Sequence, residues 1–242
     1  MGQTGSGRSI RQLILVPTLI TLAVTIFRFI GELQHWSANW FNTEMGWSII
    51  AILWLVPIFG VYFALRLSAQ GKGPDSAWRA IGFAFLGVII GIFLRGFLPF
   101  EFAFPGRLLY GWSFIVVAAL LSLAGWPALF KTLLAYAIAA RIPVAFVMFL
   151  AFRGNLGTHY DAVPSDLPAG IGLWPKYLWL GFFPQLINWV ATTIVIGMFF
   201  GTIAVGLARL RRREPLSAEV GASADAGSAR RTRLGGISNA LR

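Results

Sequence analysis

Arg141 is the only charged residue in the stretch from 133 to 152, LLAYAIAARIPVAFVMFLAF. In a helix that rises ~1.5 Å per residue, Arg141 lies ~15 Å from Lys131 and ~18 Å from Arg153, the nearest charges on either side. Such spacing puts the guanidinium near the middle of a bilayer. A charge at that depth costs a few kcal/mol or more and marks a functional site by default. Pro143 is expected to interrupt the same helix two residues later.

Two amides are expected to reach the depth of Arg141. Gln185 and Asn188 lie ~15 Å inward from Lys176 on the last apolar segment. No carboxylate lies within the apolar cores, so amides and backbone carbonyls are the nearest predicted partners. One exception is Glu101 in GFLPFEFAFPG, because a re-entrant hairpin there would carry its carboxylate down to Arg141. The alternative is an interfacial aromatic loop with an exposed Glu101.

The first apolar segment carries a polar face. Its members follow steps of three and four, which place them on one side of a helix: Thr18, Thr21, Thr25, Arg28 and Glu32. We expect this side to face the bundle, with Arg28 and Glu32 paired near the outer surface. The alternative is an arginine that snorkels to the interface.

The outer connections contain the few residues able to ligate a metal. His35, His159 and Asp161, with Glu32, form a set of the kind zinc accepts, although ordinary loop hydrogen bonding is the reading we favour. There is no cysteine, and no HExxH or GxSxG signature. We therefore expect no catalytic residue, no metal and no cofactor.

The composition predicts an all-α, polytopic transmembrane bundle. Hydrophobic residues make up 57% of the 242 residues and charged residues 12%, against about a quarter charged in soluble domains. The runs are apolar throughout, whereas barrel strands alternate apolar and polar residues. About six segments are long enough to span a bilayer: 12–30, 47–67, 78–98, 108–124, 128–152 and 176–207. The fourth is short, so five helices remain an alternative.

Basic residues predict the orientation, since they concentrate in cytoplasmic connections. They flank both termini and the even-numbered connections: Arg8, Arg11, Arg66, Lys72, Arg79, Lys131, Arg209, Arg211, Arg212 and Arg213. Both termini are thus expected in the cytoplasm, and we expect a bacterial inner membrane. The domains follow as a cytoplasmic segment 1–11, a transmembrane domain 12–213 and a disordered basic tail 214–242.

Glycine pairs predict close helix packing. Gly87 and Gly91 form one GxxxG pattern, and Gly197 and Gly201 another. Their expected role is packing within the monomer.

Three functions are compatible with these residues. The outer half carries arginines where they should be scarce: Arg28, Arg95, Arg107, Arg141 and Arg153. The first hypothesis is binding or transport of an anionic or lipid-phosphate ligand through an outward-facing polar cavity floored by Arg141, Gln185 and Asn188. Arg28, Glu32 and Glu101 are the further ligand-binding candidates. The second is a non-catalytic scaffold or subunit whose basic tail docks a protein partner. The third is a membrane enzyme with an outer-face histidine and carboxylate site. We expect membrane lipid as a partner and no nucleic acid.

Overall fold

The computed structural model describes residues 9–37, 39–41, 51–94, 97, 103–165, 167 and 170–211. Glu101, Arg95, most of the segment 1–11 and the tail 214–242 lie outside these residues, so the predictions made for them stay predictions. All regular elements in the described ranges are helical. The all-α class is confirmed.

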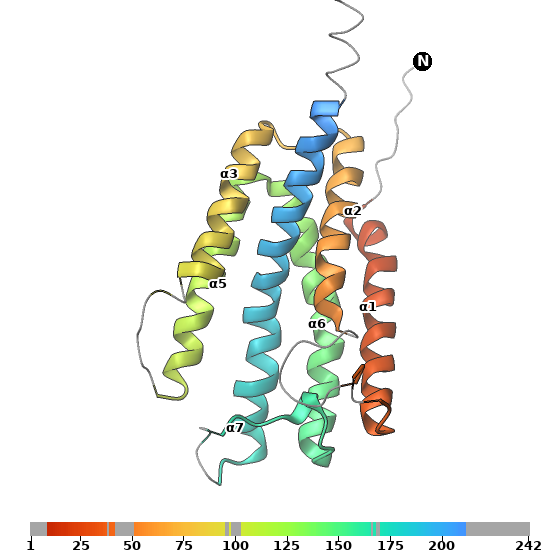
Figure 1. Cartoon of the computed structure of the whole chain (residues 1–242), viewed down its shortest axis with the longest axis vertical. Coiled ribbons are helices and arrows are strands. Elements are labelled where there is room, and N and C mark those ends of the chain that lie inside the picture. Colours follow the sequence, from red (N-terminus) through yellow and green to blue (C-terminus); the bar gives the residue numbers. More distant parts are fainter. Residues whose placement is uncertain are drawn as a thin grey trace, which may run out of the picture.

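Six helices in the described part are long and apolar enough to cross a membrane (Figure 1). They are α1 (Ile10–Leu33), η1 with α2 (Ile52–Ala69), α3 with η2 (Ala77–Leu94), α5 (Gly106–Gly125), α6 (Pro127–Gly154) and a last helix (Leu173–Arg211) that begins with α7 (Leu173–Tyr177). The fourth segment is a full helix of 20 residues, so the five-helix alternative is wrong. These helices fit a multi-pass membrane protein.

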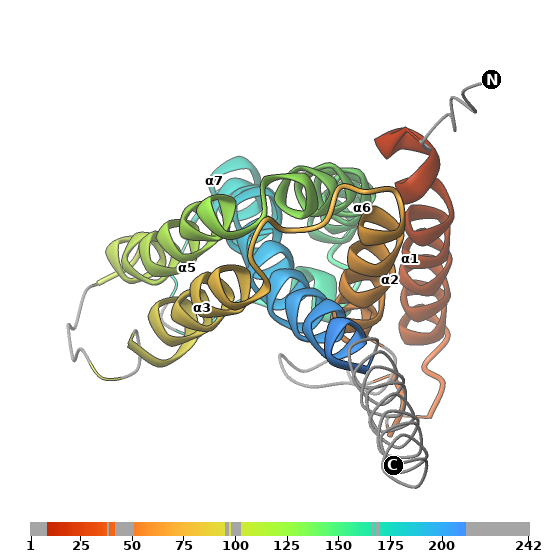
Figure 2. The same ribbon diagram turned by 90° about the horizontal axis from the view of Figure 1, so that it is seen from above.

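The last helix occupies the middle of the bundle. Viewed from above, α3 and α5 lie on one side of it and α1 and α2 on the other (Figure 2). α3 packs on α5, and α1 packs on α6. Both the start of α1 and the end of the last helix lie at the upper end in Figure 1. We call this the terminal end, and the opposite end, which carries η3 (His159–Asp161) and α7, the loop end.

Local sequence explains where the helices that carry the site begin and end. Ser9 caps α1 through a capping box with Gln12, which satisfies two backbone N–H groups that helix hydrogen bonds leave free. α6 begins at Pro127, whose missing N–H costs nothing at the first helical position. Asn155, with φ 47°, ends α6 in the left-handed conformation that asparagine tolerates.

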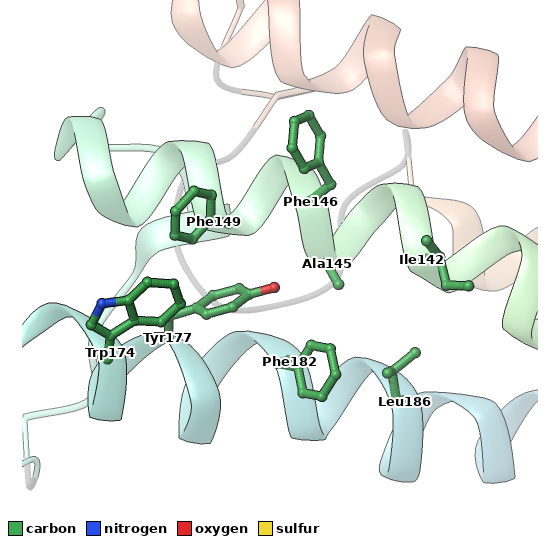
Figure 3. A pocket seen from close by; sticks show the side chains of 8 residues that line it. All are labelled: Ile142, Ala145, Phe146, Phe149, Trp174, Tyr177, Phe182 and Leu186. Carbon is green, nitrogen blue, oxygen red and sulfur yellow. The ribbon is translucent and has the colours of Figure 1, made fainter.

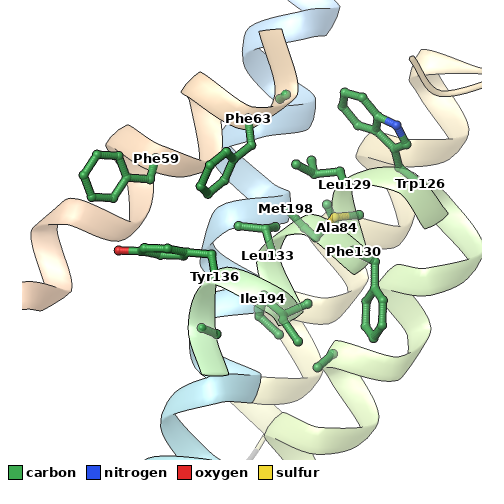
Figure 4. Close-up of a cluster of buried hydrophobic side chains, with 14 of the residues drawn as sticks. Phe59, Phe63, Ala84, Trp126, Leu129, Phe130, Leu133, Tyr136, Ile194 and Met198 are labelled. Carbon is green, nitrogen blue, oxygen red and sulfur yellow. The ribbon is translucent and has the colours of Figure 1, made fainter. Parts of the chain in front are cut away.

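Glycines let the helices approach closely, as the sequence predicts. Gly60 of α2 faces Gly197 and Gly201, and a β-carbon at Gly60 would lie 2.6 Å from the Gly197 Cα. Gly87 and Gly91 lie against α5 in the same way. Aromatic and aliphatic side chains fill the core beside the contact of Gly60 with the last helix (Figure 4). The following residues are all buried there: Phe59, Phe63, Leu129, Leu133, Tyr136 and Met198.

Prolines affect the helices differently from the expected break. α6 continues through Pro143 without interruption, so the predicted break beside Arg141 is wrong. A proline removes one N–H donor, and the other turns of α6, which packs against α1, α2 and the last helix, remain helical. The last helix contains two π-helical segments in its loop-end half, η4 (Leu178–Phe182) and η5 (Pro184–Trp189), and Pro184 is the first residue of the second.

Candidate functional site

Arg141 lies between α6 and the last helix. Its Nη1 donates to Oε1 of Gln185 at 3.3 Å, and its guanidinium lies over the Trp189 ring, 5.1 Å from the centroid. Only 5% of Arg141 is exposed. Gln185 and Trp189 both belong to the π-helical segment, whose wide turns bring residues four apart to one side. The segment therefore supplies one acceptor and one aromatic face to a single guanidinium.

The predicted amide partner is confirmed at Gln185, and Trp189 was missed. Nε2 of Gln185 contacts Sδ of Met148 at 3.3 Å, which turns the carbonyl oxygen of the amide toward Arg141. Asn188 is half-buried, and its backbone carbonyl accepts from Thr192 at 2.7 Å. The contacts that the structure gives to Arg141 do not include Asn188, whose role as a ligand residue stays a prediction. Trp189 is four residues beyond Gln185, and this spacing places the two residues on one face of an ordinary helix as well, so the sequence carried a signal for it.

Arg28 has a carboxylate counter-ion, which the described part of the chain does not give to Arg141. Nε of Arg28 lies 2.7 Å from Oε1 of Glu32, and the two residues are 7% and 1% exposed. The predicted pairing is confirmed, and the snorkelling alternative is wrong because Arg28 is buried. Within the described ranges, no carboxylate forms an ion pair with Arg141. Of these two buried arginines, Arg28 is held by a carboxylate and Arg141 by an amide and an aromatic ring.

Glu32 also holds the connection that carries η3 at the loop end. Its carboxylate accepts from the His159 backbone N–H at 2.9 Å and lies 2.6 Å from Nδ1 of the ring. Because an ionised carboxylate only accepts, Nδ1 carries the proton. Burial lowers the pKa of His159 below its ordinary value, although the hydrogen bond to Glu32 works against this. His159 therefore serves as a neutral donor near pH 7.

Tyr160 inserts beside His159 into the bundle. Its hydroxyl donates to the Thr25 carbonyl at 3.3 Å, and its ring meets Phe29 edge to face. Burial raises the pKa of Tyr160, so the hydroxyl stays protonated. It is buried in one cluster with Val144 and Met148 of α6, one and two turns beyond Arg141 toward the loop end. This layer lies between Arg141 and the loop end, where sequence reasoning expected an open polar cavity.

The polar face of α1 looks into the bundle, as predicted. Thr21 and Thr25 are buried, and each hydroxyl bonds to the backbone carbonyl four residues earlier. Oγ1 of Thr21 also lies 2.8 Å from the Tyr136 hydroxyl of α6. Oγ1 of Thr18 is buried without a hydrogen-bond partner in the described part of the chain.

The candidate metal ligands are separated by the fold. His35 is exposed, His159 is bonded to Glu32, and Asp161 accepts from Gly157 and Thr158 and so closes its own turn. Among the residues that the structure describes, no three histidine, cysteine or acidic side chains could together hold a metal ion. The hydrogen-bonding reading fits this geometry.

No protein family, curated protein or solved structure matches this chain. The functional argument therefore depends on the geometry of its own residues.

Proposed function

We propose that this chain is an integral membrane protein that binds an anionic group at Arg141, as a binding protein or a transporter. The observation that carries the proposal is the state of Arg141, which is buried at mid-helix with one hydrogen bond and one aromatic contact. We place the protein in a bacterial inner membrane with both termini in the cytoplasm, because basic residues flank the terminal end.

The chemistry of arginine defines the ligand class. A guanidinium has five N–H donors in a planar fork, and Gln185 accepts from one nitrogen only. A carboxylate or phosphate matches that fork with two parallel hydrogen bonds and supplies the missing charge. Trp189 lies over the guanidinium and restricts its orientation. These features support an oxyanion as the ligand.

Arg28 provides the comparison within the same molecule. The guanidinium of Arg28 pairs with a carboxylate four residues away in the same helix. At Arg141 the described part of the chain offers an amide, a thioether and an indole instead. A buried cation without a counter-ion is costly, so its retention fits a role in binding.

Anion-dependent thermal stability tests the proposal. Purified protein in neutral detergent would be unfolded by heat in phosphate, acetate or chloride at equal ionic strength. Phosphate or acetate should raise the Tm of the wild type. At a ligand concentration of a hundred times Kd, the expected gain in the free energy of unfolding is about 2.7 kcal/mol. Arg141→Leu should abolish this effect, and Arg141→Lys should weaken it because lysine lacks the fork. Lys131→Gln, an exposed cation on the same helix, should behave as wild type.

A scaffold or subunit is the second candidate. The Val144, Met148 and Tyr160 layer favours it, because a covered arginine can serve as a fixed structural element. In that case Arg141→Leu lowers the yield of folded protein, and no variant responds to anions. Unchanged anion stabilisation in a folded Arg141→Leu protein would instead place the binding elsewhere.

A further inference from the structure

A groove of about 400 Å³ runs between α6 and the outer half of the last helix (Figure 3). Its eight lining residues are apolar or aromatic: Ile142, Ala145, Phe146, Phe149, Trp174, Tyr177, Phe182 and Leu186. Along α6 it extends from Ile142 to Phe149, which is ~10 Å of helix. Phe146 is 60% exposed and Trp174 is 61% exposed. The groove therefore opens on the outside of the bundle, away from the buried side of Arg141.

In a bilayer an open apolar groove faces hydrocarbon. The volume is that of a small-molecule pocket, and its walls offer no hydrogen-bonding group except the Tyr177 hydroxyl and the Trp174 indole N–H. Both of these groups belong to α7, at the loop end of the groove, where aromatic side chains commonly meet the lipid head groups. One acyl chain, with its polar end toward α7, suits this arrangement of apolar and polar groups.

The charges at the loop end indicate which head group fits. Ile142, Phe146, Phe149 and Arg153 follow steps of three and four, so Arg153 continues the groove-lining stripe of α6 by one turn. Lys176 precedes Tyr177 on the opposite wall, in the helix that packs on α6. In the part of the chain that the structure describes, neither cation forms an ion pair. Two cations at head-group depth beside an apolar groove are complementary to an anionic lipid.

We propose that this groove is a binding site for one anionic phospholipid of the outer leaflet, with an acyl chain along α6 and the phosphate between Arg153 and Lys176. The proposal rests on the membrane insertion proposed above and is independent of the ligand at Arg141.

Lipid retention measured by native mass spectrometry tests it. Protein in neutral detergent would be titrated with phosphatidylglycerol or phosphatidylcholine of equal chain length. We expect one phosphatidylglycerol to be retained about tenfold more tightly than phosphatidylcholine. The double variant Arg153→Gln with Lys176→Gln should lose this preference. The control Arg66→Gln with Lys131→Gln removes two exposed cations elsewhere and should keep it.

Filling the groove tests the acyl site separately. Ala145→Leu and, at an exposed position of the same wall, Ile142→Trp should lower the retention of both lipids at least several-fold. Equal retention of the two lipids by the wild type, or a preference that survives in Arg153→Gln with Lys176→Gln, would overturn the proposal. Loss of the preference in the Arg66→Gln with Lys131→Gln control would also overturn it. Because the readout is retained lipid, failure here leaves the anion-dependent stabilisation at Arg141 as a separate result.

Discussion

Glu32 and His159, 127 residues apart in the chain, are joined by two hydrogen bonds: the Glu32 carboxylate accepts from both the backbone N–H and the ring Nδ1 of His159. The same carboxylate pairs with Arg28 at 2.7 Å. One buried acidic group thus neutralises a cation of α1 and fixes the loop-end connection that carries Tyr160. Its bonds to His159 hold in place the layer that covers Arg141 toward the loop end.

Glu32→Gln should destabilise the protein strongly. The amide keeps the shape of the side chain but removes the charge that compensates the buried Arg28, and breaking a buried pair in this way costs about 3–5 kcal/mol. Thermal or denaturant unfolding in detergent measures the change. The double variant Arg28→Gln with Glu32→Gln should recover part of the loss, because no charge is then left unpaired. A cost below about 1 kcal/mol for Glu32→Gln would contradict this account.

The free energy of unfolding should decrease as pH decreases through the range where His159 titrates. The histidine pKa is near 6.5 when unfolded and is lowered in the folded protein, so the unfolded chain binds the proton first as pH falls. The stabilisation is fully present above pH 6.5 and is lost as pH falls through the lower, folded pKa. His159→Gln should remove this part of the pH dependence of Tm. His35→Asn, which removes the other histidine at an exposed position, should retain it.

Two glycines should respond oppositely to alanine. Gly60→Ala places a methyl group against the Gly197 backbone, and overpacking of this kind costs about 1–3 kcal/mol. At Gly82 of α3 nothing lies within 4 Å of an added β-carbon, so Gly82→Ala should stabilise by about 0.5–1 kcal/mol through helix propensity. Equal effects in unfolding measurements would show that α2 and the last helix do not meet at Gly60.

Thiol labelling can test whether the layer of Val144, Met148 and Tyr160 covers Arg141 toward the loop end, because the chain has no cysteine of its own. Val144→Cys should react slowly with a membrane-impermeant thiol reagent, since Val144 is buried in one cluster with Tyr160. Adding Tyr160→Ala should speed the reaction at least tenfold. Leu156→Cys, at an exposed position just beyond α6 at the loop end, is the reactive reference, and Ala137→Cys, deep in the core, is the unreactive one. Fast labelling of Val144→Cys in a protein that keeps Tyr160 would show that Arg141 is accessible to solvent from the loop end.

The helices and their inward faces could be predicted from the sequence for a simple physical reason. A span needs ~20 apolar residues, and a polar face repeats at the helical period, so both properties are local along the chain. Six spans, the buried face of Thr21, Thr25, Arg28 and Glu32, and the packing glycines followed from such patterns. The proximity of Gln185 to Arg141 followed from equal depth.

The remaining features depend on the tertiary structure because they join segments distant in sequence or depart from regular helix geometry. The fold decides that the Trp189 ring lies against Arg141 and that α6 continues through Pro143. His159 lies 127 residues from Glu32, and no spacing rule connects them. The sequence by itself determined that a charged residue is buried among apolar helices. Only the fold decided that the carboxylate of Glu32 also bonds to His159, and that the guanidinium of Arg141 lies against the Trp189 indole.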